Sequence, residues 1–116
     1  MAARRVTVFL SHADAGALRL AGSCALAATA LGDRVDVYLF GPAVRAIVEA
    51  HDGEDDGPAG LLHQARGAGA CRVFACSASL VEERVALADA ERALDGVVGW
   101  PTILEWSRGV PDRFSF

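Results

Sequence analysis

Hydrophobic positions along this chain fall into short runs separated by longer segments of helical periodicity. Residues 5–10 and 35–40 are rich in β-branched and aromatic side chains, which is typical of buried strands. Between these runs, apolar residues recur at helical spacing: Leu18, Ala21, Ala25, Ala28 and Leu31. This stripe predicts a helix over about residues 15–31. Strand, helix and strand in this order predict a βαβ unit with parallel strands and a right-handed crossover.

The same alternation continues through the rest of the chain. Its pattern predicts helices over 43–50, 59–68, 80–94 and 101–106, and strands over 72–76, 97–98 and 113–116. Ser79 and Glu82 fit a capping box at the start of the helix predicted over 80–94, and an acidic surface loop is expected over 51–58. The order of elements predicts one domain, 1–116, of the α/β class. Its architecture is a three-layer α/β/α sandwich around a mostly parallel five-stranded sheet.

Composition narrows the function classes. Hydrophobic residues make up 53% of the 116 positions and charged residues 22%, which excludes a disordered chain. The formal net charge is −4, and no basic block occurs, so we expect neither nucleic acid nor an anionic membrane as a partner. All 11 basic residues are arginine, which excludes a lysine Schiff base and a P-loop lysine.

No stretch resembles a membrane span or a secretory signal, so a cytoplasmic protein is expected. The three cysteines are too few and too irregular for a secreted disulfide framework. They form no CxxC pair, and the histidines show no paired ligand spacing, so no metal site is expected. Dinucleotide, phosphate-loop and nucleophile-elbow motifs are also absent, and we expect no cofactor.

Candidate chemistry gathers beyond the carboxyl ends of the predicted strands, where parallel sheets bind ligands. Cys76 closes the third predicted strand, just before the start of a helix. Amide groups and the positive dipole end at a helix start favour the thiolate, which is the nucleophilic form of cysteine. Cys76 is therefore the candidate catalytic residue. The alternative is a cysteine that is packed in the core and inert.

The candidate binding residues surround Cys76 on this rim. Ser77 and Ser79 would stabilise its charge through amides and hydroxyls, whereas Ser11 and His12 follow the first strand, where His12 could assist a substrate or be an ordinary loop histidine. Cys71 begins the same strand as Cys76, about 16 Å away and on the opposite face, so the two cannot form a disulfide. Cys76 would therefore act alone or with a partner protein.

The chain resembles the DsrE/DsrF-like family of sulfur-relay proteins over nearly its whole length. The resemblance is carried by the early βαβ unit ending at 35–40, by the strand 69–76 with its terminal cysteine, and by the closing segment 112–116. It implies a flavodoxin-like, DsrEFH-like sandwich that assembles into trimers or hexamers. In active members a cysteine at the end of this strand carries sulfur as a persulfide, and only Cys76 matches that position.

The resemblance leads to a specific functional hypothesis with alternatives. We expect a persulfide carrier that exchanges sulfur with donor and acceptor proteins through Cys76. A second hypothesis is a non-enzymatic, oligomeric binding or scaffold protein in which Cys76 is packed. A third is a thioredoxin-like redox protein, because residues 99–109 are similar to the segment around the cis-proline of thioredoxins; the absence of CxxC counts against it. The exposed-looking aromatics Trp100, Trp106, Phe114 and Phe116 favour oligomer formation.

Overall fold

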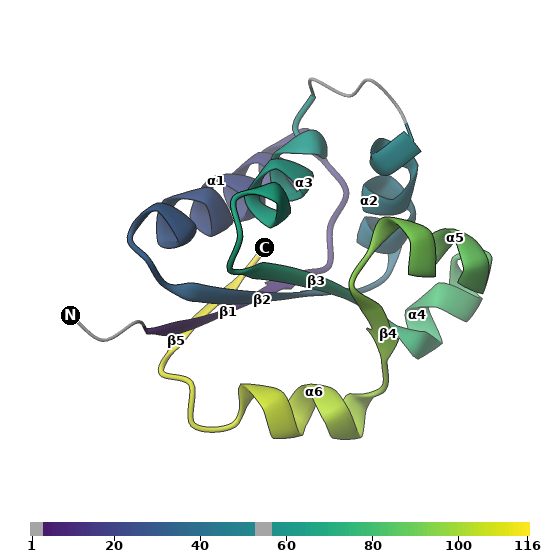
Figure 1. Cartoon of the computed structure of the whole chain (residues 1–116). Coiled ribbons are helices and arrows are strands. Elements are labelled where there is room, and N and C mark those ends of the chain that lie inside the picture. The colour runs from purple at the N-terminus through teal and green to yellow at the C-terminus, as the bar shows by residue number, and fades with distance from the viewer. Residues whose placement is uncertain (1–3, 53–56) are drawn as a thin grey trace.

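A computed structural model of the chain describes residues 4–52 and 57–116, and this part forms a five-stranded sheet. The strands are β1 (Arg5–Leu10), β2 (Arg34–Leu39), β3 (Cys71–Cys76), β4 (Gly96–Val98) and β5 (Asp112–Ser115). Their order across the sheet is β4-β3-β2-β1-β5, and every neighbouring pair is parallel (Figure 1). The predicted α/β class is confirmed, with a sheet that is entirely parallel.

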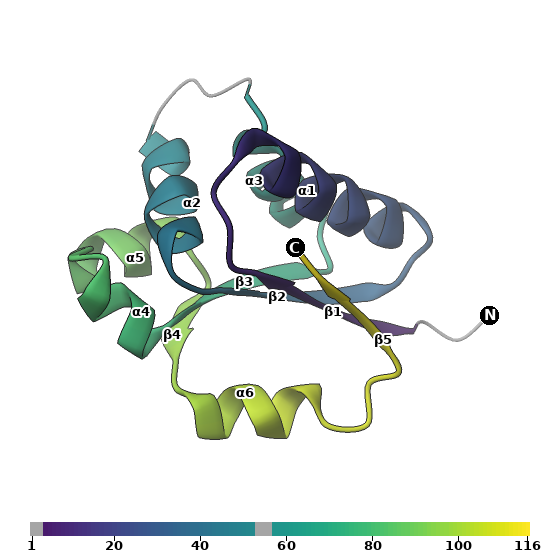
Figure 2. The same ribbon diagram turned by 180° about the vertical axis from the view of Figure 1, so that it is seen from behind.

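Helices cover both faces of this sheet and produce the predicted three layers. One face carries α1 (Ala15–Ala30), α2 (Pro42–Asp52), α3 (Gly60–Gly67) and α5 (Leu87–Ala93), whereas α6 (Trp100–Ser107) covers the other (Figures 1 and 2). The short helix α4 (Ser77–Glu82) lies beside the edge strand β4. Within the described ranges, no helix is long and apolar enough to cross a membrane.

The path of the chain explains why the helices divide unequally between the two faces. From β1 to β4 each strand is added on the same side of the previous one, with the connecting helices on one face. The chain then returns beneath the sheet through α6 and adds β5 beyond β1. A reversal of direction requires the opposite face if every crossover is right-handed, and right-handed crossovers are the strong rule for parallel strands.

Successive side chains of a strand point to opposite faces of the sheet, and they contribute to two separate hydrophobic clusters. In β3, Cys71, Val73 and Ala75 belong to the large cluster under the four-helix face, whereas Phe74 and Cys76 belong to a smaller cluster under α6. Cys71 and Cys76 therefore lie on opposite faces, as the odd spacing predicts. The smaller cluster is largely aromatic, and we call it the α6 cluster: it contains Tyr38, Phe74, Cys76 and Ile103, bordered by Phe9, Phe40, Val98 and Trp106.

Helix α1 begins and packs as its sequence predicts, except at its end. The Asp14 carboxylate caps it by accepting a hydrogen bond of 3.1 Å from the Ala17 amide. Its small buried residues allow close approach to α3, since a Cβ built on Gly22 would lie 2.4 Å from the Cβ of Leu61. The predicted stripe is buried from Leu18 to Ala28, but Leu31 is 79% exposed. Leu31 is the C-cap residue, one position beyond the last residue of the helix.

The long helix predicted over 80–94 is wrong, because the structure divides it into α4 and α5. Arg84 has φ of 54°, a left-handed conformation that interrupts a right-handed helix. The capping box is also wrong: Cys76 occupies the N-cap position of α4, and Ser79 lies inside the helix. The periodicity of residues 80–94 persists on both sides of the break because both segments pack on the same core.

The acidic loop predicted over 51–58 begins later than expected. His51 and Asp52 are the last residues of α2, which is longer than the predicted helix over 43–50. Residues 53–56 of this predicted loop lie outside the described part of the chain.

Candidate functional site at the carboxyl edge of β3 and β4

The sheet topology creates a natural site between β3 and β4. The chain leaving β3 turns into α4 and α5, whereas the chain leaving β4 turns into α6 beneath the opposite face. Neighbouring strands whose connections depart to opposite faces leave a crevice at their carboxyl ends, which is where parallel sheets bind ligands. Cys76 and Ser77 form one side of this point, and Gly99 and Trp100 form the other. A Cβ built on Gly99 would lie 3.7 Å from the Ser77 hydroxyl oxygen, so the two sides are in close proximity.

Cys76 is placed at the junction of β3 and α4 as the sequence predicts. It pairs with Val98 in the sheet, and it is the extended residue, with φ −69° and ψ 128°, that precedes the first turn of α4. Its side chain belongs to the α6 cluster with Tyr38, Phe74 and Ile103, and the residue is only 2% exposed. The thiol is thus held at the candidate crevice, but beneath a cover of aromatic side chains.

Ser77 and Ser79 differ in their environment. Ser77 is exposed and lies beside Gly99. Ser79 is 8% exposed, and its hydroxyl oxygen accepts a hydrogen bond of 2.9 Å from the Gly41 amide. This bond ties α4 to the turn after β2, so Ser79 has a structural role in the described chain. Helix α4 has six residues, so its dipole supplies less positive potential than the long predicted helix would.

Ser11 and His12 lie apart from Cys76, on the other side of β2. Both are exposed, and the Ser11 amide donates a hydrogen bond of 2.9 Å to the carbonyl oxygen of Phe116. The Ser11 hydroxyl lies 3.3 Å from both that oxygen and Nδ1 of His12. Since β2 separates β1 from β3, the ends of these strands are about 10 Å apart at ordinary strand spacing. The candidate residues thus form two groups, with Cys76, Ser77 and Ser79 in one and Ser11 and His12 in the other.

An aromatic layer beneath the sheet covers the thiol, and our sequence analysis did not identify it. Phe9, Tyr38 and Phe74 stand on adjacent strands with ring centroids 5.8 and 5.9 Å apart. Phe40 stacks on Trp100 with centroids 5.1 Å apart and an interplanar angle of 21°. The signal was present in the sequence, because Phe9, Tyr38 and Phe74 occupy equivalent alternate positions in three strand-like runs. The register of the strands was needed to align them.

Tyr38 is the most unusual polar residue of this layer. It is fully buried, and its hydroxyl finds no hydrogen-bond partner in the described part of the chain. Burial, with a smaller contribution from the charge of Asp36, raises the pKa of Tyr38 to about 12. Asp36 is itself paired with Arg72, with 3.0 Å between Oδ1 and Nε. The phenol therefore remains neutral and contributes mainly packing.

The other two cysteines are poor candidates for chemistry at this site. All three cysteines are free thiols. Burial raises the pKa of the Cys71 thiol to about 12, and Cys71 faces the opposite side of the sheet from Cys76. Cys24 is half-buried on α1, and burial raises its pKa as well. Neither can readily form the thiolate or resolve Cys76 within one chain.

Other chemistry finds little support in the described residues. Across residues 4–52 and 57–116, no cluster of three or more histidine, cysteine or acidic side chains could hold a metal ion. A hollow of about 560 Å³ lies next to Arg5, Val110 and Asp112, near the amino ends of β1 and β5. It is at the opposite edge of the sheet from Cys76. We give more weight to the carboxyl edge, because topology and a candidate nucleophile coincide there.

Comparison with known proteins identifies the fold. No family model matches the chain, and no curated protein matches it either. Among solved structures, the YchN protein from E. coli superposes with a TM-score of 0.67, covering 97% of this chain and 99% of YchN, at 15% sequence identity. YchN has the DsrE-like fold. The chain therefore has the same α/β architecture as YchN, with five parallel strands between layers of helices.

Proposed function

We propose that the protein carries sulfur as a persulfide on Cys76. The observation that carries this proposal is the place of Cys76 at the end of β3, where the β3 and β4 connections diverge in a DsrE-like fold. Ser77 directly follows Cys76 in the chain and is exposed beside Gly99. The partners are a sulfur donor protein and an acceptor protein, and the site of action is the cytoplasm.

The proposed transfer is a pair of thiol exchange steps. The Cys76 thiolate attacks the outer sulfur of a donor persulfide, the donor S–S bond breaks, and the donor thiolate leaves. Cys76 then holds the additional sulfur as a persulfide. An acceptor thiolate attacks that outer sulfur, and Cys76 returns as a thiolate. No net oxidation occurs, which is consistent with a site that lacks a second cysteine in reach.

The cover over Cys76 limits when this exchange can occur. With 2% of the residue exposed, a bulky donor cannot reach the sulfur until the aromatic layer moves. Trp100 is the accessible part of that layer, since it is 51% exposed and follows directly after Gly99. We propose that a donor protein displaces Trp100 from Phe40 to reach the thiol.

Mass spectrometry of the intact protein tests the proposal. A C24A/C71A variant keeps Cys76 as its single cysteine, and incubation with a low-molecular-weight persulfide should add one sulfur atom to it. Reduction with a thiol should remove that atom. A matched variant carrying C76A instead, with Cys24 and Cys71 intact, should gain none under the same conditions. Sulfur retained by the C76A variant would contradict the assignment.

Burial of Cys76 favours a second candidate function. A cysteine packed among Tyr38, Phe74 and Ile103 is also what a non-catalytic scaffold or binding protein would contain. In that case Cys76 would react with a small alkylating agent only after unfolding, and C76A would lose stability without loss of any sulfur-binding capacity. The native alkylation rate of Cys76 therefore distinguishes the two candidates.

A further inference from the structure

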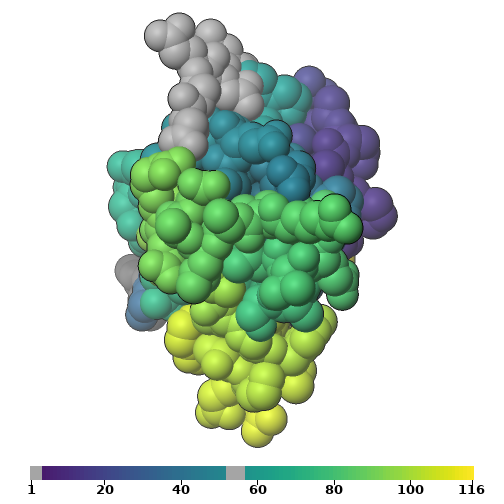
Figure 3. All heavy atoms as spheres, turned by 90° about the vertical axis from the view of Figure 1, so that its right-hand side faces the viewer, coloured from purple at the N-terminus to yellow at the C-terminus, as the bar shows by residue number. Residues whose placement is uncertain are grey.

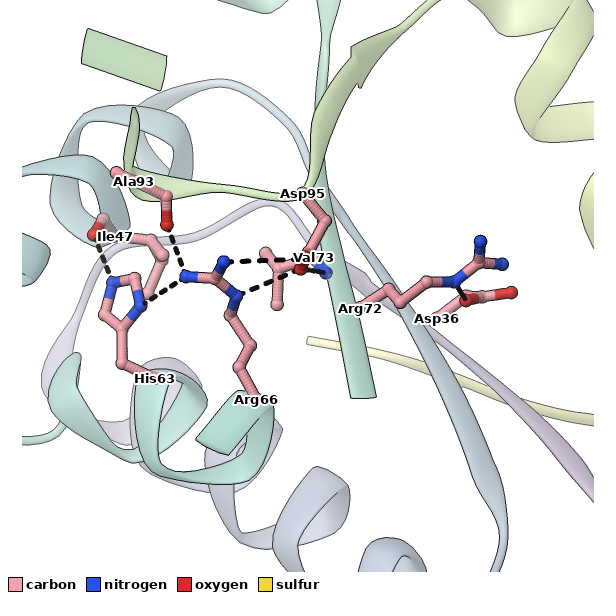
Figure 4. Close-up of polar contacts among 8 residues, drawn as sticks. All are labelled: Asp36, Ile47, His63, Arg66, Arg72, Val73, Ala93 and Asp95. Atoms are coloured by element: carbon pink, nitrogen blue, oxygen red, sulfur yellow. Dashed lines mark hydrogen bonds and ion pairs between the residues drawn. The ribbon is translucent and has the colours of Figure 1, made fainter. Parts of the chain in front are cut away.

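A chain of polar contacts connects four elements on the face opposite α6 (Figure 4). Nε2 of His63, on α3, lies 2.8 Å from the carbonyl oxygen of Ile47 on α2, and its Nδ1 lies 3.2 Å from Nη1 of Arg66. Arg66 also donates to the carbonyl oxygen of Ala93 at the end of α5, and it pairs with Asp95 at 3.0 Å. We call this set the His63 network.

Asp95 extends the His63 network into the sheet. Its carboxylate accepts a hydrogen bond of 2.7 Å from the amide of Val73 on β3, and its own amide donates to the Val73 carbonyl oxygen at 2.8 Å. Asp95 immediately precedes β4, whose Val98 pairs with Cys76. Arg66 thus anchors the connection between α5 and β4 against both α3 and β3.

Both ring nitrogens of His63 are engaged in a way that allows one protonation state. A carbonyl oxygen only accepts, so Nε2 must carry the proton that it donates to Ile47. A guanidinium only donates, so Nδ1 must be the unprotonated acceptor of Arg66. The network therefore requires the neutral Nε2–H tautomer. A second proton on Nδ1 would point at a guanidinium N–H and remove the acceptor.

The surroundings of His63 lower its pKa and so disfavour the second proton. Burial lowers the pKa of His63 most, and the charges of Arg66 and His51 lower it further. The ring of His51, on α2, has its centroid 5.4 Å from that of His63. The bond to Ile47 and the carboxylate of Asp95 act in the opposite direction, but the net direction is down.

We propose that the His63 network is an acid-sensitive latch that holds the α5–β4 connection in place. Protonation of His63 removes the Nδ1 acceptor of Arg66 and places a second positive charge beside the guanidinium, which loosens the hold of Arg66 on Ala93 and Asp95. The same segment leads into the strand that pairs with Cys76, so opening the latch weakens the edge of the sheet beside the candidate crevice. This inference does not depend on the sulfur chemistry of Cys76.

Urea unfolding at pH 8 and pH 5 tests the latch. His63 binds a proton more weakly in the folded state than in the unfolded state. The free energy of unfolding should therefore have its full value above about pH 6.5 and should fall as the pH drops from there to the folded-state pKa of His63. Over that interval His63 should raise the unfolding equilibrium constant by up to about tenfold per pH unit. His63→Gln keeps a donor and an acceptor but cannot titrate, so it should lack this component.

Two controls complete the test. His12→Gln removes an exposed histidine outside the network, and it should retain the pH dependence of the original protein. An unchanged pH dependence in His63→Gln would overturn the proposal. If His63→Gln does not fold, a ¹⁵N NMR titration of the unaltered protein decides: we expect the Nε2–H tautomer and protonation below pH 6.5, with shifts at the Val73 and Asp95 amides. The other tautomer, or protonation at higher pH, would overturn it equally.

Discussion

The chemistry of Cys76 depends on what covers it more than on its place in the chain. A cysteine at a strand end, before a helix, is well placed to become a thiolate. The structure adds an aromatic cover: Cys76 shares a cluster with Tyr38 and Phe74, and Phe40, which borders this cluster, stacks on Trp100. Reactivity at this residue is therefore a question of how often the cover opens.

Trp100→Ala should make Cys76 more reactive in the native protein. Loss of the stack with Phe40 removes an interaction worth about 0.5–1.5 kcal/mol, so the aromatic cover should open about two to thirteen times more often. The rate of alkylation of Cys76, measured in the C24A/C71A background, should rise by this factor. Leu104→Ala is the matched control, because Leu104 lies on the same helix and is 55% exposed. Equal rates in both variants would show that Trp100 does not control access.

Helices of this fold are defined by close packing as much as by periodicity. Gly22 allows α1 and α3 to approach each other closely. The pattern of polar and apolar residues does not distinguish this packing glycine from the glycines at turns. The break between α4 and α5 is similar, since Arg84 adopts a left-handed conformation in a stretch without glycine or proline. In both cases the packing of neighbouring elements overrides the local preference of the residue.

Gly22→Ala should destabilise the protein, because the new methyl group would lie 2.4 Å from Leu61 Cβ and such overpacking costs roughly 1–3 kcal/mol. The gain of about 0.8–1 kcal/mol that alanine provides in a helix offsets part of this cost, so the net loss should be up to about 2 kcal/mol. Gly67→Ala is the matched control, because a Cβ there meets nothing within 4 Å. Chemical denaturation should show a lower midpoint for Gly22→Ala alone. A stabilised Gly22→Ala variant would mean that α1 and α3 are free to separate.

At the scale of the whole molecule, the topology brings together residues that are far apart in sequence. Cys76 ends β3 and Trp100 follows β4, and both lie at the carboxyl edge of the sheet because these two strands are neighbours (Figure 1). The space-filling view in Figure 3 shows α4 and α5 lying directly above α6 on this side of the molecule. The candidate site thus belongs to the fold rather than to one motif.

The surface also bears on the proposed assembly into trimers or hexamers. Trp100 and Phe114 are 51% and 44% exposed, whereas Trp106 and Phe116 are partly buried against the two clusters. Two of the four aromatics predicted to lie on the surface are thus largely inside. Large exposed apolar residues also occur on α1, α4, α5 and α6 and beyond the end of α1: Leu20, Leu31, Val81, Leu87 and Leu104.

We predict a homo-oligomer at micromolar concentration, because such apolar residues are commonly covered in an assembly. Light scattering coupled to size-exclusion chromatography measures the mass directly. Phe114→Arg places a charge on β5 and Leu104→Arg places one on α6. The variant whose charge lies in the subunit interface should show a lower particle mass than the unaltered protein. A monomer in the unaltered protein would contradict the prediction and would weaken the proposed relation to the sulfur-relay family.

Local sequence pattern was sufficient for the class of fold and for most elements. Runs of β-branched and aromatic residues in the strands and the stripe of small residues in α1 both indicate burial, and buried segments must form regular secondary structure. The position of Cys76 at the end of β3 follows from the same local signals. These features depend on neighbours within about four residues along the chain.

The tertiary structure alone decided which residues meet. Strand order separates His12 from Cys76 and places Trp100 just after the strand that pairs with Cys76, and it depends on contacts between distant segments that no local pattern encodes. The same is true of Ser79, which bonds to Gly41 rather than capping a helix, and of the His63 network, which joins α2, α3, α5 and β3. Burial of a thiol or an imidazole, and therefore its chemistry, is a property of the assembled layers.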